Sequence, residues 1–385
     1  MSQPVYVLGA ARTPVGSFQG SLANFSAPEL GAHAIQAALQ GANVAAADVD
    51  EVIMGNVVSA GLKQAPARQA MRIAQLPDAV HATTLNKVCG SGMRATMMAM
   101  DVIRAGSANT VIAGGMESMS NAPYLMSKAR GGLRMGHSDL KDSLFTDGLE
   151  DAETGGSMGS FAQQTADDYQ LTREAMDAYA TESVLRARAA IEAQSLANEI
   201  APMEVNGMEV RDDEQPGRAK LDKIPNLRPA FKADGTITAA NSSSISDGAS
   251  ALVLSGSAPA GSTPLARIVG HATHSIHPSE FTIAPVGAIN KLAAQLDWDL
   301  ADVDLFEINE AFAMVTMLAM QELGLPHDRV NIHGGACAQG HPIGSTGSRL
   351  IVTLAHAMAA RDLKRGIAAL CIGGGEATAV ALERD

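Results

Sequence analysis

Three residues with reactive side chains stand beside glycine-rich turns in this sequence. Cys89 directly precedes Gly-Ser-Gly (residues 90–92) at the start of an expected apolar helix, and His341 lies in Gly-His-Pro-Ile-Gly (340–344). Cys371 lies two residues before three consecutive glycines. Because the unpaired N–H groups and dipole of a first helical turn stabilise an anion, we expect Cys89 to have a lowered pKa and to act as a nucleophile.

A histidine and an amide complete a set suited to acyl transfer. Pro342 stiffens the backbone that carries His341, and Asn309 follows an expected strand with an uncharged hydrogen-bond donor. This set predicts acyl transfer through a thioester, in which one thiolate attacks, backbone N–H groups stabilise the oxyanion, and a second group moves a proton on carbon. The alternative for each cysteine taken alone is a small, buried, apolar side chain.

The histidines and cysteines do not have the spacing of a metal site. Cys337 and His341 lack two further ligands, and His271, His274 and His277 are not helically spaced. We therefore expect no metal.

An internal repeat indicates how these turns come together. Ala-Asp-Val-Asp occurs at 47–50 and at 301–304, and Gly-Ser opens a helix at 90–91 and at 344–345, both at an offset of 254 residues. Two halves with one βαβ-rich plan would place the turns of Cys89 and His341 at equivalent sheet ends, facing each other across a pseudo-twofold axis. Chance similarity of segments rich in small residues is the alternative.

Composition excludes several classes of partner. A net charge of −13 and 3% aromatic residues argue against nucleic-acid binding. The most apolar helical run, 350–360, is shorter than the ~20 residues that span a bilayer, so we expect no membrane segment. An odd number of cysteines, three, and no visible export signal predict a cytoplasmic protein.

The stretch 119–240 is long and poor in strand signals, and we interpret it as an inserted domain. It contains an amphipathic helix near 172–194 and a segment, 211–232, that is net positive and includes Arg218. That segment is either a local anion site or a solvated surface loop.

Four ordered motifs resemble the signatures of the thiolases, and the resemblance extends over essentially the whole chain. The motifs are residues 86–92 (NKVCGSG), 309–313 (NEAFA), 334–347 (GGACAQGHPIGSTG) and 371–376 (CIGGGE). The family implies an α/β thiolase fold, a five-layered αβαβα core made of two pseudo-repeated halves with an inserted loop domain. It also implies an assembly that is usually a homotetramer, a dimer of dimers.

On this resemblance the chain divides into three domains. The N-terminal thiolase half takes residues 1–118 and 241–264, the loop domain takes 119–240, and the C-terminal half takes 265–385. The loop domain is expected to bind coenzyme A and to make oligomer contacts.

The resemblance also implies roles for the reactive residues. Cys89 would be the acylated nucleophile, and His341 the base that activates it and part of one oxyanion hole. Cys371 would be the acid/base on the α-carbon of the attacking acetyl-CoA. Asn309 would hold the water that completes that hole, and the N–H groups of Cys89 and Gly373 would form the other.

Coenzyme A thioesters enter as substrates, and no tightly bound cofactor is implied. Ser243 resembles the serine that touches the pantetheine arm, and Arg218 lies near the expected phosphate contacts. Met135 resembles the methionine that a tetramerisation loop brings to a neighbouring subunit. Further residues match pocket positions: Leu149, Met158, Phe231 and Phe312. Phe281 falls where room for the acyl chain is decided, and its ring favours a short acyl group.

The activity implied is that of an acetyl-CoA C-acetyltransferase, which condenses two acetyl-CoA to acetoacetyl-CoA and CoA through an acetyl-cysteine in ping-pong order. The alternative within the family is a degradative 3-ketoacyl-CoA thiolase of broader chain length. An NAD(P)-dependent oxidoreductase is a remote alternative, because no Gly-x-Gly-x-x-Gly opens the first βα unit. A thiolase-like lipid carrier without catalysis is disfavoured by the intact cysteines and histidine.

Overall fold

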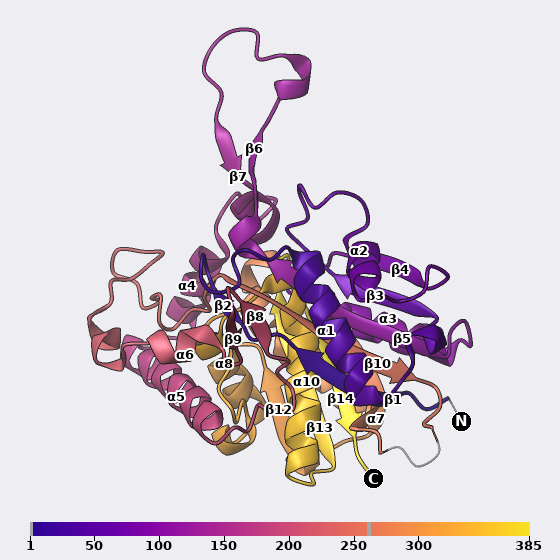
Figure 1. The fold of residues 1–385 in the computed structure, drawn as a ribbon. Helices are drawn as coiled ribbons and strands as arrows, with labels where there is room; N and C mark the ends of the chain where they lie inside the picture. Colours follow the sequence, from indigo (N-terminus) through magenta and orange to yellow (C-terminus); the bar gives the residue numbers. More distant parts are fainter. Residues whose placement is uncertain (1–2, 260–262) are drawn as a thin grey trace.

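The computed structural model describes residues 3–259 and 263–385. These residues form one large, twisted, mixed sheet with helices packed around it (Figure 1). Residues 1–2 and 260–262, which the sequence assigns to the N-terminal half, lie outside the described residues. The strands of the main sheet are β1 (Tyr6–Arg12), β2 (Gly16–Ser17), β3 (Glu51–Gly55), β4 (His81–Leu85), β5 (Thr110–Ser118), β10 (Ser246–Ser255), β11 (Ala266–Ser275), β12 (Leu305–Ile308), β13 (Arg365–Ile372) and β14 (Glu376–Glu383).

Helices cover this sheet and fill the long connection between β5 and β10. They are α1 (Ala27–Ala42), α2 (Pro66–Ile73), α3 (Ser91–Arg104), α4 (Met158–Asp168), α5 (Arg173–Glu192), α6 (Glu214–Arg218), α7 (Ala284–Leu296), α8 (Ala313–Leu323), α9 (Ala336–Gln339) and α10 (Ile343–Ala360). Two small hairpins pair β6 (Tyr124–Met126) with β7 (Leu140–Asp142) and β8 (Met203–Val205) with β9 (Met208–Val210).

The strand order confirms the internal repeat. Strands β3, β5, β10 and β1 lie side by side in one half, and β12, β13, β14 and β11 lie in the same order in the other. In each half the first pair is parallel and the next two are antiparallel. The halves meet where β1 pairs with β11 through Tyr6↔Arg267 and Val7↔Ala266. The ten-stranded sheet is therefore two similar sheets joined edge to edge.

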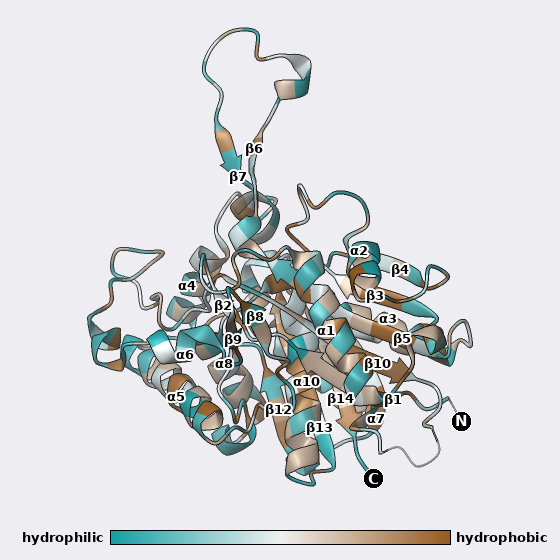
Figure 2. Ribbon diagram, viewed as in Figure 1, coloured by the Kyte–Doolittle hydropathy of each residue, from teal (hydrophilic) through white to brown (hydrophobic). Residues whose placement is uncertain are grey.

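Helices on both sides of each half-sheet build the five layers. Helices α3 and α10 pack against each other in the middle, α1 and α2 cover the outer face of the N-terminal half, and α7 and α8 cover that of the C-terminal half. All nine residues of β5 and seven of the eight in β13 are buried, as expected for strands covered on both faces. Figure 2 shows the hydrophobic colouring concentrated on these central strands.

The segment between β5 and β10 leaves the layers. The predicted helix near 172–194 is α5, capped by Thr172, whose hydroxyl accepts from the N–H of Ala175 at 3.2 Å. The β6–β7 hairpin and its connecting loop form an arm that projects away from the body (Figure 1). Within residues 3–259 and 263–385, no helix is long and apolar enough to cross a bilayer.

Close approach of β5 and α10 depends on a missing side chain at Gly115. A Cβ built there would lie 1.9 Å from the carbonyl oxygen of Gly344 in the first turn of α10. Gly115→Ala should lower the free energy of unfolding by about 1–3 kcal/mol, measured by urea denaturation, because backbone must move to relieve the overlap. The control is Gly41→Ala in α1, where no heavy atom lies within 4 Å of the added Cβ. An equal effect of both substitutions would contradict the packing argument.

Candidate active site

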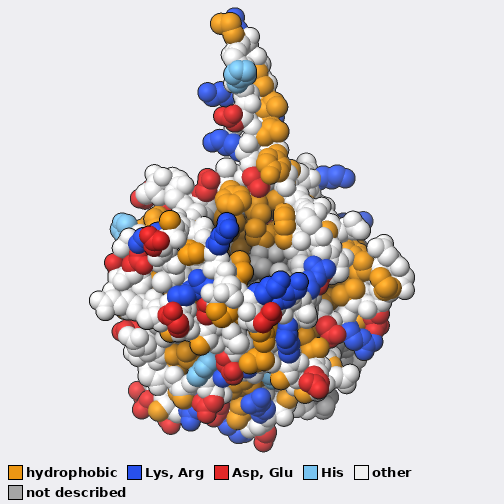
Figure 3. All heavy atoms as spheres, turned by 90° about the vertical axis from the view of Figure 1, so that its left-hand side faces the viewer, with side chains coloured by type: hydrophobic (Ala, Val, Ile, Leu, Met, Phe, Trp, Pro, Cys, Tyr) orange, Lys and Arg blue, Asp and Glu red, His pale blue; other side chains and the backbone are white. Residues whose placement is uncertain are grey.

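A cavity of about 490 Å³ brings together reactive residues from both halves. Cys89 and His341 line it together with Gly373 and side chains from the inserted segment. The face drawn in Figure 3 is hollowed below the arm, with hydrophobic side chains in the hollow and Lys and Arg side chains beside it. Residues 252 positions apart, Cys89 and His341, thus share one apolar cavity, as the repeat predicts.

The turn before α3 holds Cys89 in a constrained geometry. Val88 has a φ of +47°, a left-handed conformation that is strained for a β-branched residue. Hydrogen bonds over-determine this turn: the Val88 N–H donates to Asn86 Oδ1 at 2.9 Å, and the Ser91 hydroxyl donates to the Val88 carbonyl at 2.6 Å. The strain is therefore held in place by neighbours of the nucleophile.

The pKa of Cys89 does not follow the expectation from the sequence. Burial raises the pKa of its thiol to about 11, and the N–H groups of Gly373 and of Cys89 itself offset this only in part. The nearby carboxylate of Glu117 raises it further. The prediction of a lowered pKa was wrong. The free-energy cost of removing a thiolate from water exceeds the stabilisation of that thiolate by the N–H groups at a helix start. At neutral pH the sulfur is a thiol and needs a base.

His341 lines the same cavity, and one of its ring nitrogens can accept a proton. Its Nδ1 lies 2.6 Å from Thr346 Oγ1, which donates its one proton to the carbonyl of Pro342 at 3.0 Å. The hydroxyl oxygen therefore accepts from Nδ1–H, and Nε2 is the unprotonated nitrogen. Nε2 has no hydrogen-bond partner among the described residues. Burial, with a contribution from Arg349, lowers the pKa of His341 to about 3, so the ring is neutral at physiological pH.

Cys371 and Asn309 are buried, and neither is among the residues that line the cavity. Burial raises the pKa of Cys371 well above its ordinary value, and the charge of a Cys89 thiolate raises it further, so the two sulfurs are neighbours. Asn309 follows β12, where its N–H donates to the carbonyl of Ala369 at 3.0 Å. Its side-chain amide is fully buried, and neither amide atom has a partner in the described part of the chain. Cys371 thus lies near Cys89, and the Asn309 amide has unused hydrogen-bonding capacity.

Six of the eight side chains expected to contact coenzyme A line this cavity. They are Leu149, Met158, Phe231, Ser243, Phe281 and Phe312. The ring centroid of Phe312 lies 6.1 Å from that of Phe231 and 6.5 Å from that of Phe281, both edge-on. Three aromatic rings from separate segments therefore build one apolar wall.

The other two expected contacts lie elsewhere in the single chain. Met135, on the arm, is 97% exposed and does not line the cavity. The guanidinium of Arg218 forms an ion pair with Glu214 within α6 and does not line the cavity either.

Two residues that support the site were missed from the sequence. Glu117 accepts hydrogen bonds from the N–H groups of Val57 at 3.0 Å, Val58 at 3.1 Å and Gly344 at 2.8 Å, and burial raises its pKa to about 7. Thr346 orients His341. The spacing of Thr346 four residues after Pro342 was a usable signal, because a threonine in a first helical turn can bond the i−4 carbonyl.

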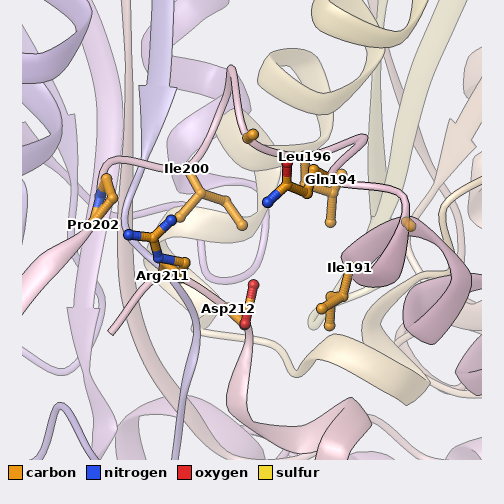
Figure 4. Close-up of a pocket in the computed structure, with 9 residues that line it drawn as sticks. Ile191, Gln194, Leu196, Ile200, Pro202, Arg211 and Asp212 are labelled. Atoms are coloured by element: carbon orange, nitrogen blue, oxygen red, sulfur yellow. The ribbon is translucent and has the colours of Figure 1, made fainter. Parts of the chain in front are cut away.

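The described residues do not meet the requirements of a metal site, and they contain a second, smaller cavity. In the part of the chain that the structure describes, no group of three or more His, Cys, Asp or Glu side chains could hold a metal ion. A second cavity of about 160 Å³ lies beyond the C-terminal end of α5, and it shares no lining residue with the cavity of Cys89 (Figure 4). Arg211 and Asp212 are its charged lining residues, and it contains no cysteine or histidine.

Comparison with known families accounts for nearly the entire chain. Residues 5–258 match the model described as "Thiolase, N-terminal domain", and residues 262–384 match "Thiolase, C-terminal domain". The boundary between the two matches falls close to the junction of the two sheet halves.

Curated relatives and solved structures agree with these matches. The chain is 47% identical to the acetyl-CoA acetyltransferase of Pseudomonas aeruginosa, with 100% of each chain covered, and 46% identical to that of Escherichia coli, with 98% of each covered. Its structure is similar to the Acat5 thiolase of Ascaris suum in complex with coenzyme A, at a TM-score of 0.94 and 40% identity over 99% of this chain and 100% of that one. It is also similar to human mitochondrial 3-ketoacyl-CoA thiolase in complex with CoA, at a TM-score of 0.96 and 37% identity over 100% and 98%.

The raised pKa of Cys89 predicts how its reactivity depends on pH. With a pKa of about 11, the rate of alkylation by iodoacetamide should rise about tenfold per pH unit from pH 7 to 9, since only the thiolate reacts. Mass spectrometry of the labelled peptide measures the rate, and Cys89→Ser is the control for site assignment. A plateau reached below pH 8 would show that the first turn of α3 outweighs burial.

Proposed function

This chain belongs to the thiolase family of acyltransferases, and we propose that it condenses two acetyl-CoA to acetoacetyl-CoA and free CoA, reversibly and in ping-pong order. One observation carries the proposal: Cys89, with the N–H of Gly373 on its sulfur, shares a cavity with the unprotonated Nε2 of His341. A thiol, a neutral base and an N–H donor are the groups that acyl transfer from a thioester requires.

The first half-reaction acylates Cys89. Nε2 of His341 takes the thiol proton as the sulfur attacks the thioester carbon of acetyl-CoA. The oxyanion that develops is stabilised by the N–H groups of Cys89 and Gly373. The bond between carbon and the CoA sulfur then breaks, the acetyl group stays on Cys89, and His341 returns the proton to the leaving CoA thiolate.

The second half-reaction forms the carbon–carbon bond. Nε2 of His341, neutral again once CoA has left, takes the thiol proton of Cys371, and the resulting thiolate removes a proton from the methyl group of a second acetyl-CoA. The thioester oxygen of that acetyl-CoA is stabilised by the protonated His341 and by a water held on Asn309. The raised pKa of Cys371 supports this role, because a basic sulfur is suited to a weakly acidic C–H group. The carbanion attacks the acetyl carbon, the bond between that carbon and the Cys89 sulfur breaks, and His341 returns its proton to the Cys89 thiolate.

The aromatic wall supports a short acyl group. Phe281 is buried in the turn Pro278–Ile283 and contacts Phe312 edge-on, which reduces the room beside Cys89 for a longer chain. The curated relatives named acetyl-CoA acetyltransferase agree. The structural similarity to a 3-ketoacyl-CoA thiolase keeps the broader-chain thiolase as the second candidate. The matches to the two thiolase domains disfavour the alternative of an NAD(P)-dependent oxidoreductase.

The proposal also covers the domain boundaries, the contact of Arg218 with the coenzyme, and the assembly of the subunits. We assign 1–118 with 241–264 and 265–385 to the two thiolase halves and 119–240 to the loop domain that binds coenzyme A. Arg218 would reach the coenzyme when its pair with Glu214 opens. Exposed apolar side chains on the arm, Met135 among them, support assembly as a homotetramer. We place this assembly in the cytoplasm.

The two cysteines should separate the half-reactions. In Cys371→Ala we expect acetyl transfer from acetyl-CoA to Cys89 to persist within about threefold, while exchange of methyl protons of acetyl-CoA with D2O falls at least about 10²-fold, because the base is gone. Radiolabelled acetyl transfer and NMR measure the two rates. Cys337→Ala should retain both activities, and Cys89→Ala should lose acetylation. Normal proton exchange in Cys371→Ala would reject the role of that sulfur.

The chain-length assay tests the substrate. We expect kcat/KM for thiolysis of acetoacetyl-CoA to exceed that of 3-ketooctanoyl-CoA by at least about tenfold, since the rings of Phe281 and Phe312 oppose a longer chain. Phe281→Ala should lower the ratio of kcat/KM for acetoacetyl-CoA to kcat/KM for 3-ketooctanoyl-CoA, because it removes a ring that opposes the longer chain. A preference of the unmodified protein for the longer substrate would instead establish the degradative 3-ketoacyl-CoA thiolase.

A further inference from the structure

An ion pair joins the two loops that carry the N–H groups facing the acyl carbon. The ammonium of Lys87, in the turn before Cys89, contacts Oε2 of Glu376, the first residue of β14. The hydroxyl of Ser275 in β11 donates to the other carboxylate oxygen at 3.3 Å. Both charged side chains are partly buried, at 22% and 33% exposure. The pair therefore links the N-terminal half to the C-terminal half beside the cavity.

The loop on the Glu376 side has little stiffness of its own. Gly373, Gly374 and Gly375 connect paired residues Ile372 and Glu376 of β13 and β14. Gly374 and Gly375 have φ values of +90° and +83°, which glycine adopts without strain but which it also leaves readily. The N–H of Ile276 donates to the carbonyl of Gly375 at 2.7 Å and holds one point of this loop. The direction of the Gly373 N–H consequently depends on that bond and on what anchors the two ends of the loop.

Apolar contacts set the separation of the two loops. A Cβ built at Gly90 would lie 2.3 Å from Cδ1 of Ile372, and one built at Gly373 would lie 3.6 Å from Cγ1 of Val88. Such contacts limit how closely the loops approach, but they are not directional. The Lys87–Glu376 pair is directional, and it acts at the residue that follows the three glycines.

The charge of Lys87 is directed at Glu376 and not at the nucleophile. The pKa of Cys89 is raised by burial and by Glu117, whereas the N–H groups of Gly373 and Cys89 lower it. A lysine that activated the sulfur would instead hold its pKa down. The contact of Lys87 that the structure shows is therefore with the residue that follows the three glycines.

We infer that the Lys87–Glu376 pair is a positioning element for acyl transfer, which keeps the N–H of Gly373 aimed at the sulfur and the oxyanion at Cys89. This inference rests on the proposed function for its effect on catalysis. A partly exposed ion pair contributes little to global stability, so its charges can be reversed without unfolding the protein.

Charge reversal tests the pair directly. Lys87→Glu and Glu376→Lys should each lower kcat for acetoacetyl-CoA thiolysis about tenfold, with KM within about twofold, since a misaimed oxyanion donor acts in the transition state. The double variant should recover kcat to within about threefold of the unmodified protein. Thermal midpoints of all variants should agree within about 2 °C.

A matched control removes one charge at each end of the same strand. Glu376→Gln should lower kcat severalfold. Glu383→Gln, which loses the pairs with Arg267 and Arg365 at the far end of β14, should leave kcat within about twofold. Equal losses in the two variants would show that any weakening of β14 suffices and would overturn the inference.

The alkylation rate of Cys89 supplies a readout that does not require thiolase activity. Because the Gly373 N–H stabilises the thiolate, each single charge reversal should slow iodoacetamide labelling at pH 8 about threefold, and the double variant should restore it. If the unmodified protein lacks thiolysis but this pattern holds, the proposed function fails and the positioning role stands. Unchanged labelling in the single variants, no recovery in the double variant, or an effect confined to KM would overturn the inference.

Discussion

One buried carboxylate ties the two halves of the molecule together at the reactive site. Glu117, at the end of β5, accepts from the N–H groups of Val57 and Val58 in its own half and from Gly344 at the start of α10 in the other. Gly344 follows His341 by three residues, so this carboxylate sets where the imidazole lies relative to the turn of Cys89. Such an arrangement needs the backbone contact between β5 and α10 that only glycines permit.

Exclusion of water gives the site its chemical character. Burial raises the pKa of Cys89 and Cys371 and lowers that of His341, so all three groups are neutral at rest. In the proposed reaction, charge would appear only during acyl transfer, beside the backbone N–H groups of Gly373 and Cys89 that already lie at the sulfur. The tautomer of His341, fixed by Thr346, leaves Nε2 as the basic nitrogen, and it has no hydrogen-bond partner among the described residues.

The particular successes and errors of sequence reasoning have a common physical origin. The repeated Ala-Asp-Val-Asp and Gly-Ser landmarks predicted the paired half-sheets and the meeting of Cys89 with His341, because repeats in order imply repeats in topology. The sign of the Cys89 pKa shift was wrong, since a helix start is visible in sequence whereas the desolvation that outweighs it is not. Arg218, expected from the net-positive segment 211–232 to lie near the phosphate contacts, does not line the cavity. Met135 was expected at a neighbouring subunit, and it does not line the cavity of its own chain either.

The sequence by itself determined the kind of chemistry and the plan of the fold. Residue types beside glycine-rich turns identified two thiols, an imidazole and an amide, and the offset of the repeat specified two similar halves. Only the tertiary structure decided the protonation states and the linkage of Lys87 to Glu376. These depend on distance and burial between residues hundreds of positions apart, and electrostatic free energies change steeply with both.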